Sequence, residues 1–369
     1  MSFLSIRYVS WAVLVGATLL GSTSARAQDA AVAEPVNITT VDGVKLKGLF
    51  YPSAGRDAPT VIILHPINDK NGMKSPEWKN LAEALQKAKY SVMMFDFRGH
   101  GDSTSIDEAN LFWSKPQNQI SVKTKNKQVI EVKDYIKQGN AYLPVLVNDI
   151  AAVRAYLERR NDTSKDCNTS NLIVIGAESG ATLGALWINS EWYRYKFTPH
   201  PMFPQVLNRG TMAAKSEGVD IIAAVFLSVS PTLEKRSVKV EGLLKTACKD
   251  NGMAATFFCG SGDKSSANFA KNLESKLKVK NSNKHEFIGA VELNTDLTGM
   301  KLLQKGLKTE ESIVKYLDAV VADRKVQRED REFANTFYVW RTSIGIFRAR
   351  NNKTEKNLNF DDYSKFITP

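Results

Sequence analysis

Residues 176–180 read Gly-Ala-Glu-Ser-Gly and hold two side chains, Glu178 and Ser179, that could carry chemistry. Glycines at both ends of this segment permit a tight turn between a strand and a helix. In the register that puts Glu178 at the turn, a carboxylate is presented to attack an electrophile or to hold a cation. In a register shifted by one residue, the Ser179 hydroxyl is presented instead.

A serine nucleophile needs a neighbouring base, and the chain has four histidines that could supply one. His65 and His100 follow apolar runs of strand length, whereas His285 precedes the last such run and so lies at the opposite end of its strand from a site. His200 lies in an aromatic-rich segment, where it is either an exposed loop residue or a base that moves in with its loop. The loop after the last run, 294–300, contains no histidine.

From residue 60 onward, apolar runs of strand length alternate with segments of helical spacing. This alternation indicates an α/β fold, with a mostly parallel central sheet and helices on both faces. Runs at 36–40 and 44–51 flank a Val-Asp-Gly connection, which predicts an N-terminal antiparallel hairpin. The expected strands are 60–65, 91–96, 171–175, 221–229, 254–259 and 287–293, and the expected helices are 78–88, 145–159, 269–277 and 312–321. Ligands of such sheets bind beyond the carboxyl ends of the strands, so the site is expected in the loops that follow them.

Three of these loops resemble those of the α/β-hydrolase superfamily. They read Leu-His-Pro at 64–66, Phe-Asp-Phe-Arg-Gly-His-Gly-Asp-Ser at 95–103, and Gly-Ala-Glu-Ser-Gly at 176–180, and the resemblance extends over most of 36–321. The resemblance implies the α/β-hydrolase fold and a nucleophile elbow at 176–180. It also implies an acid at Asp263 and an oxyanion hole of backbone amides. These amides would come from around Ile67, in the loop that begins at His65, and from Ser179 in the elbow.

The chain departs from that family pattern at two positions. Glu178 takes the place of the nucleophilic serine, and Ser179 takes the next position, whose family role is a backbone amide. The loop at 294–300, where the family carries its histidine, has none. Related dehalogenases and epoxide hydrolases attack with an elbow carboxylate, but they use Asp and still need that histidine. Without a histidine to orient, Asp263 is equally interpreted as a turn former.

A non-catalytic role for Glu178 is also consistent with the sequence. A carboxylate at a helix N-terminus is stabilised by the helix dipole by about 0.3–1 kcal/mol. Glu178 could therefore fill the oxyanion hole and lock the turn, or present its charge to a cationic ligand. The chain is similar to a group of exported bacterial α/β-hydrolase-like proteins with a Gly-Ala-Glu-x-Gly-Ala elbow, and this resemblance implies no established substrate.

The N-terminus has the features of a signal peptide. Arg7 precedes an apolar stretch at 9–20, and Ala-Arg-Ala at 25–27 predicts cleavage after residue 27. The protein is therefore expected to be exported, to the periplasm, the cell surface or the medium, with no transmembrane segment after cleavage. The expected organisation is a signal peptide at 1–27, a linker at 28–35, an α/β-hydrolase-like domain at 36–324 and a C-terminal extension at 325–369. Two insertions in the domain, 103–143 and 191–218, are candidate lids. The extension is expected to dock on the sheet edge or to bind a partner.

Composition limits the classes of partner. The chain has 369 residues, of which 43% are hydrophobic, and a formal charge of +11 that is not concentrated in blocks. A dispersed positive charge favours weak affinity for an anionic polymer or surface over a nucleic-acid interface. No metal or nucleotide motif is present, so no cofactor is expected. The three cysteines are too few for a disulfide framework; they are expected to be buried, and the alternative is one bridge with one thiol left over.

Three functions are compatible with these observations. The first is a pseudohydrolase that lacks the Ser-His-Asp set and binds an unknown small molecule or peptide in the cleft where the related hydrolases bind their substrates. The second is an active ester or peptide hydrolase, of serine aminopeptidase type, that attacks with Ser179 in a shifted elbow. The third is a basic protein that binds surfaces.

Overall fold

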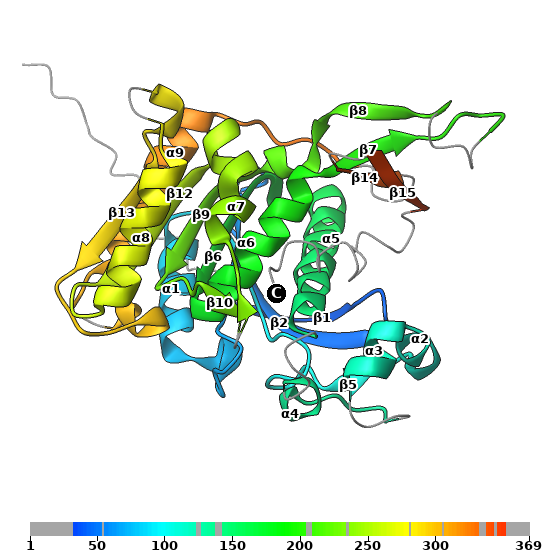
Figure 1. Cartoon of the computed structure of the whole chain (residues 1–369), viewed down its shortest axis with the longest axis horizontal. Coiled ribbons are helices and arrows are strands. Elements are labelled where there is room, and N and C mark those ends of the chain that lie inside the picture. The colour runs from blue at the N-terminus through cyan, green and yellow to red at the C-terminus, as the bar shows by residue number, and fades with distance from the viewer. Residues whose placement is uncertain are drawn as a thin grey trace, which may run out of the picture.

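A central sheet organises the molecule (Figure 1). The computed structural model describes residues 32–53, 55–122, 127–136, 142–203, 209–233, 236–279, 282–304, 306–331, 337–342 and 345–351. The strand order is β1-β2-β4-β3-β6-β9-β12-β13, and the pairs from β4 to β13 are parallel, whereas β1 pairs antiparallel with β2. The α/β prediction with an N-terminal hairpin is confirmed. The strands are β1 (Glu34–Thr39), β2 (Val44–Tyr51), β3 (Pro59–Leu64), β4 (Ser91–Phe95), β6 (Asn168–Ala177), β9 (Ile221–Leu227), β12 (Ala254–Gly260) and β13 (Ile288–Leu293).

Helices cover both faces of this sheet because its buried strands are apolar on both sides. In β3, Ile62 and Leu64 contribute to one core, and Val61 and Ile63 contribute to the other. The first core includes side chains of α5, α6, α7 and α8, and the second includes side chains of α1 and α9. These helices are α1 (Pro76–Lys87), α5 (Val147–Thr163), α6 (Glu178–Trp192), α7 (Val240–Leu244), α8 (Lys264–Leu277) and α9 (Thr309–Arg324).

The first insertion, 103–143, packs beside the N-terminal hairpin (Figure 1). Its short strand β5 (Ser105–Ile106) pairs with β2, and the Asn118 amide donates a hydrogen bond to Asp42 in the hairpin turn at 3.0 Å. Its role as a lid stays a prediction. The insertion also contains α2 (Ala109–Trp113), α3 (Pro116–Ser121) and α4 (Val132–Tyr135), and the 3-10 helix η2 (Leu143–Leu146) leads into α5.

The second insertion and the C-terminal extension form a separate sheet of order β15-β14-β7-β8. It consists of β7 (Arg194–Thr198), β8 (Thr211–Ser216), β14 (Phe337–Thr342) and β15 (Gly345–Asn351). The extension was expected to dock on the edge of the central sheet or to bind a partner. In the structure, β14 of the extension pairs antiparallel with β7 of the second insertion and not with a strand of the central sheet, while partner binding stays a prediction.

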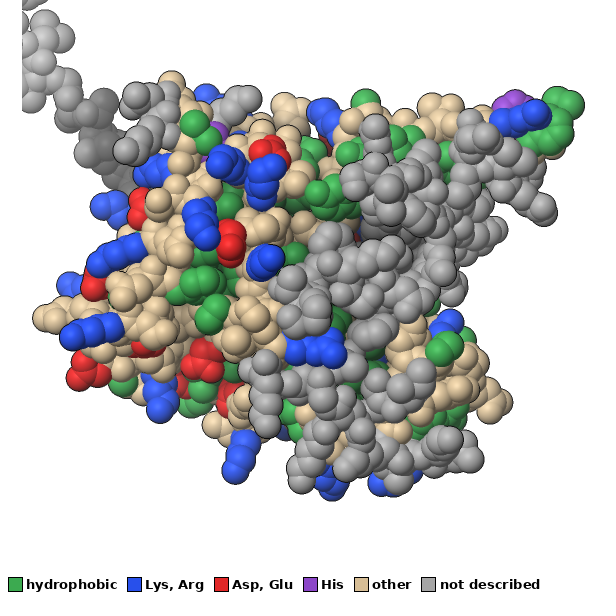
Figure 2. Space-filling view, viewed as in Figure 1, with side chains coloured by type: hydrophobic (Ala, Val, Ile, Leu, Met, Phe, Trp, Pro, Cys, Tyr) green, Lys and Arg blue, Asp and Glu red, His purple; other side chains and the backbone are tan. Residues whose placement is uncertain are grey.

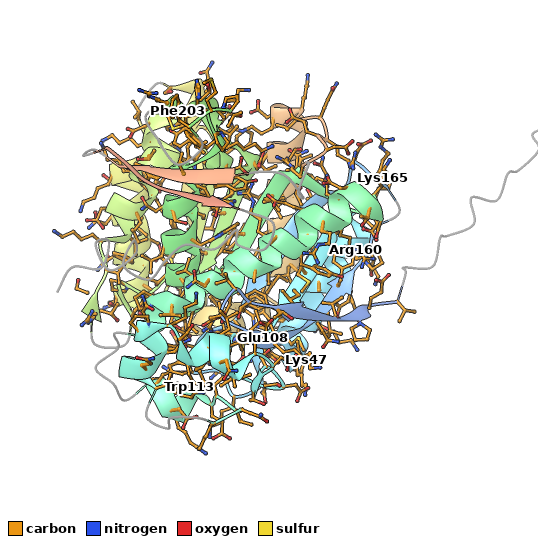
Figure 3. The ribbon with its side chains drawn as sticks, turned by 90° about the vertical axis from the view of Figure 1, so that its right-hand side faces the viewer. Lys47, Glu108, Trp113, Arg160, Lys165 and Phe203 are labelled. Atoms are coloured by element: carbon orange, nitrogen blue, oxygen red, sulfur yellow. The ribbon has the colours of Figure 1, made fainter. Side chains whose placement is uncertain are left out.

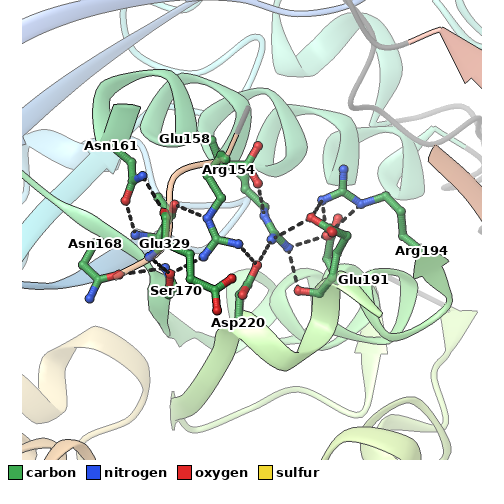
Figure 4. Close-up of polar contacts among 12 residues, drawn as sticks. Arg154, Glu158, Asn161, Asn168, Ser170, Glu191, Arg194, Asp220 and Glu329 are labelled. Atoms are coloured by element: carbon green, nitrogen blue, oxygen red, sulfur yellow. Dashed lines mark hydrogen bonds and ion pairs between the residues drawn. The ribbon is translucent and has the colours of Figure 1, made fainter. Parts of the chain in front are cut away.

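A strap at 326–331 connects α9 to this second sheet and is held by polar contacts (Figure 4). Asn171 donates to the Val326 carbonyl at 2.8 Å, and Asn161 donates to the Glu329 carbonyl at 3.0 Å. Arg331 donates to Thr169 at 3.1 Å and to Asp220 at 2.9 Å. The strap is thereby fixed to the start of β6 and the end of α5.

Asp220 belongs to a buried ion cluster in which carboxylates outnumber guanidiniums (Figure 4). Arg154 contacts Glu158, Glu191 and Asp220 at 2.9, 2.5 and 2.6 Å, and Arg194 also pairs with Glu191. The cluster comprises four carboxylates (Glu158, Glu191, Glu217, Asp220) and three guanidiniums (Arg154, Arg194, Arg331), a difference of one negative charge. Burial raises the pKa of Asp220 from 3.8 to about 6, against the lowering effect of Arg331 and Arg154.

This raised pKa predicts how stability depends on pH. The folded state holds the Asp220 proton more tightly than the unfolded state, so the stabilisation is complete below pH 3.8 and is lost as pH rises through about 6. The free energy of unfolding should therefore fall between pH 4 and 6.5 more steeply in the wild type than in Asp220→Asn, by up to about 3 kcal/mol. Urea unfolding at several pH values measures this difference. The exposed Asp57→Asn variant should keep the wild-type slope, and equal slopes for the wild type and Asp220→Asn would contradict the account.

The remaining short elements complete the connections. They are η1 (Gly72–Lys74), η4 (Glu217–Asp220), β10 (Thr232–Leu233), β11 (Arg236–Ser237), the π-helix η5 (Lys245–Asp250), η6 (Asn283–His285) and η7 (Gly299–Leu303). The three cysteines are buried and free, as predicted. Among the described helices, none has the length and apolar character needed to cross a membrane. The predicted signal peptide lies outside the described residues.

Candidate functional site

The turn from β6 into α6 has the backbone that an exposed elbow requires. The strand ends at Ala177, the helix begins at Glu178, and Glu178 has a positive φ of 49°. Such a φ is strained for a residue other than glycine and costs of the order of 1–3 kcal/mol. A Cβ on Gly176 would lie 2.8 Å from the Ala181 Cα, and one on Gly180 would lie 2.6 Å from the Leu64 carbonyl oxygen. Both flanking positions therefore have room only for glycine.

The Glu178 carboxylate is directed at the loop that follows β13. A Cβ on Gly299 would lie 2.7 Å from Glu178 Cδ and 2.9 Å from its Cγ, so the carboxylate lies against the backbone of Gly299. Gly299 itself has a φ of 57°. This loop, 294–300, is the one that contains no histidine. Gly299 leaves space there that the longer side chain of Glu178 occupies.

Burial and charge both act on Glu178. Burial, and the neighbouring Asp69 carboxylate, raise the pKa of Glu178 above its ordinary value, while Lys301 acts in the opposite direction. Among the described residues, no hydrogen-bond donor is paired with the Glu178 carboxylate. Its backbone is held in place, because Ser230 donates its N–H to the Glu178 carbonyl at 3.4 Å and Thr182 donates to the Ser230 carbonyl at 2.6 Å.

The Ser179 hydroxyl contacts the loop that follows β3. The Ile67 N–H donates to Ser179 Oγ at 2.9 Å. Ile67 is one of the two residues expected to offer an oxyanion amide, and this amide is bonded to Ser179, so Glu178 does not fill it as one interpretation had proposed. Neither Ser179 nor Glu178 is bonded to a histidine in the described part of the chain.

Each histidine has other partners. His65 accepts the Phe97 N–H at 3.2 Å and lies 2.8 Å from the Pro66 carbonyl, and burial together with His100 lowers the pKa of His65 to about 3, so its ring is neutral. His100 lies 2.5 Å from the Ile67 carbonyl, and His285 lies 2.9 Å from the Lys249 carbonyl. His200 accepts the Met202 N–H at 3.2 Å. His65 and His100 thus hold the loops around the elbow in place.

Asp263 caps helix α8. It accepts the Ser266 N–H at 3.1 Å and the Ser266 hydroxyl at 2.5 Å. N-terminal capping of this kind satisfies a backbone donor that has no partner within the helix. In this arrangement Asp263 has the turn-forming role that the sequence allowed.

Three residues near the elbow were not among the sequence candidates: Asp69, Lys301 and Gly299. Asp69 lies two residues beyond Ile67. Burial, and in smaller measure Glu77, raise the pKa of Asp69 against the lowering effect of the hydrogen bond from the Asn71 backbone. One oxygen of Asp69 is buried and has no hydrogen-bond partner among the described residues. Asp69 could have been suspected from its place in the loop after β3. Gly299 and Lys301 carry no comparable signal in the sequence, because the approach of their loop to Glu178 arises only in the folded chain.

The arrangement offers two carboxylates and few groups for acid–base catalysis. In the described residues, no cluster of three or more His, Cys, Asp or Glu side chains has the arrangement of a metal site. Among the described residues, the charged groups that act on the Glu178 carboxylate are Asp69 and Lys301.

Comparison with known proteins identifies short sequence matches and a shared fold. No known family profile matches the chain. The uncharacterized protein YfhR of Escherichia coli K12, and its counterpart in strain O157:H7, are 34% identical to it over 92 residues, which is 24% of this chain and 32% of the relative. The match thus spans about a third of the length of these curated relatives.

Solved structures resemble a larger part of the chain. DcsB in complex with its substrate analogue superposes with a TM-score of 0.50 at 11% identity, over 79% of this chain and all of that chain. The Pyrococcus furiosus esterase Pf2001 has a TM-score of 0.48 at 16% identity and covers 78% and 90% of the two chains. Dienelactone hydrolase from Anabaena variabilis has a TM-score of 0.47 at 13% identity, over 81% and 99%. At these identities the likeness bears on the fold alone.

Proposed function

We propose, on the premise that this chain has the α/β-hydrolase fold, that it is a binding protein without hydrolytic turnover. Its elbow carboxylate, Glu178, binds the cationic group of a small molecule or peptide. The observation that carries this proposal is the position of Glu178 at the strained turn, with a half-buried carboxylate that has no hydrogen-bond donor among the described residues. A fold of this kind does not itself confer activity.

The local charge supports a cationic ligand. Asp69 is close enough to Glu178 to raise its pKa, and Lys301 is the cation that opposes this effect. The exposed Lys301 does not balance two carboxylates. An ammonium or guanidinium group would supply the missing charge and donate hydrogen bonds to the Glu178 oxygens.

The same contacts argue against a serine hydrolase. Nucleophilic attack by a serine needs a base within about 2.6–3.2 Å, somewhat more in an unliganded site. Ser179 is instead bonded to the Ile67 amide, and Asp263 is bonded to Ser266. The export signal in the sequence supports a further part of the proposal, namely that binding takes place outside the cytoplasm.

Calorimetric titration with alkylammonium ions tests the binding proposal. Hexylammonium is expected to bind the wild type and to bind Glu178→Gln at least tenfold more weakly, because the substitution removes the charge and keeps the shape. Hexanol, which has no charge, should bind both proteins equally. As the pH is lowered, Glu178 is protonated and loses the charge that binds hexylammonium. Because the pKa of Glu178 is raised, this loss of affinity should begin at a higher pH than for an ordinary glutamate.

Glu310→Gln is the matched control. Glu310 is also a half-buried glutamate in the first turn of a helix, α9, with a pKa raised by burial. This variant should bind hexylammonium as the wild type does. Equal affinity of the wild type and Glu178→Gln for hexylammonium would exclude Glu178 as the binding group.

A further inference from the structure

The hairpin of β7 and β8 forms an arm that projects from the body of the protein (Figure 1). Near its end, Met202 is 77% exposed and Phe203 is 41% exposed. The other strongly exposed large hydrophobic side chains of the described residues are all valines, and no two of them are consecutive. Figure 3 looks onto this side of the molecule and labels Phe203.

The apolar end of the arm has a defined local structure. His200 accepts the Met202 N–H at 3.2 Å, and the rings of His200 and Phe203 lie 5.5 Å apart. The Arg209 guanidinium lies 4.3 Å from the centre of the same Phe203 ring. The exposed Phe203 is therefore held by contacts with a histidine and a cation.

The arm also carries basic residues and no acidic ones. Between Glu191 and Glu217 the sequence contains no Asp or Glu. Over the same span Arg194 is buried and paired with Glu191, whereas Lys196, Arg209 and Lys215 make no ion pair with any residue that the structure describes. Figure 2 shows blue, green and purple side chains together at the end of the arm.

We propose that this arm is a contact site for an anionic lipid surface. Met202 and Phe203 would enter the boundary between headgroups and acyl chains, and Lys196, Arg209 and Lys215 would lie near the headgroup phosphates. Apolar burial together with attraction of basic side chains to anionic lipids is the general mode of binding by peripheral membrane segments. An anionic polysaccharide would satisfy the cations, but it would leave the apolar end in water.

Vesicle sedimentation tests the proposal directly. The full chain is expected to sediment with phosphatidylcholine vesicles that contain phosphatidylglycerol and to remain in solution with phosphatidylcholine alone. The Met202→Ser/Phe203→Ser variant should bind at least tenfold more weakly, and Lys196→Gln and Lys215→Gln should each bind about fivefold more weakly. Raising the salt to about 0.5 M should release the wild type.

The control is Val219→Ser/Val279→Ser, which changes two valines that are 43% and 40% exposed and should leave vesicle binding unchanged. All variants share the apolar segment at 9–20, so its contribution cancels in the comparison. Equal binding by the wild type and the Met202→Ser/Phe203→Ser variant would overturn the proposal. It would also be overturned if that variant lost self-association, measured by light scattering, without losing vesicle binding, because the arm would then contact a second copy of the chain.

Discussion

Replacing Arg98 with leucine is expected to lower the free energy of unfolding by about 3–5 kcal/mol, or to abolish folding, because it leaves two buried carboxylates without their cation. Arg98 is fully buried and donates to Asp42 at 2.6 and 2.9 Å and to Asp149 at 2.7 and 2.8 Å. Burial alone would raise the pKa of Asp42, but the charge and hydrogen bonds of Arg98 outweigh it and lower that pKa to about 2.

This ion network also bears on the site. Arg98 lies two residues before His100, whose ring contacts the Ile67 carbonyl. Loss of the network should therefore loosen the loop that carries the Ile67 amide. Urea unfolding followed by circular dichroism measures the loss, and Arg98→Lys, which keeps the charge but not the planar fork, should recover part of it. A change below about 1 kcal/mol in Arg98→Leu would contradict the role assigned to the network.

The second large effect is expected from Gly180→Ala. The added Cβ would lie 2.6 Å from the Leu64 carbonyl oxygen and still closer to that of His65, and neither backbone atom can turn away as a side chain can. Strand β3 and helix α6 would have to separate at the elbow. We expect a loss of about 3 kcal/mol in the free energy of unfolding, at the upper end for overpacked substitutions.

Gly184→Ala is the control within the same helix. Its added Cβ would lie 3.0 Å from Leu64 Cδ1 and 3.2 Å from Val174 Cγ1, which are side-chain atoms that can shift. Alanine also favours a helix interior over glycine by about 1 kcal/mol, so this variant should be close to the wild type in stability. Equal effects of the two substitutions would show that the elbow is not closely packed on β3.

The central fold could be predicted from the sequence because its signals are local. Val61, Ile62 and Ile63 form a continuous apolar run because β3 is buried on both faces. Gly176 and Gly180, on either side of Glu178, indicate a tight turn in the sequence. In the structure both pack directly against backbone atoms, where a larger residue would not fit. Periodicity and turn residues report such features directly.

Contacts between distant segments could not be predicted in this way. The pairing of Tyr338 with Lys196 joins segments far apart in the sequence, and neither strand indicates its partner. The approach of Gly299 to Glu178 likewise depends on how the loop after β13 folds back. The sequence left Asp263 open between a triad acid and a turn former, because both roles use the same residue at the same place.

We propose that the elbow presents Glu178 and that Ser179 is not a nucleophile. Reaction of the wild type, Glu178→Ala and Ser179→Ala with a fluorophosphonate probe and a panel of activated esters tests this proposal. We expect no labelling and no turnover by any of the three proteins while circular dichroism shows each of them folded. Labelling and turnover in the wild type that disappear only in Ser179→Ala would contradict it and establish a serine hydrolase with a shifted elbow.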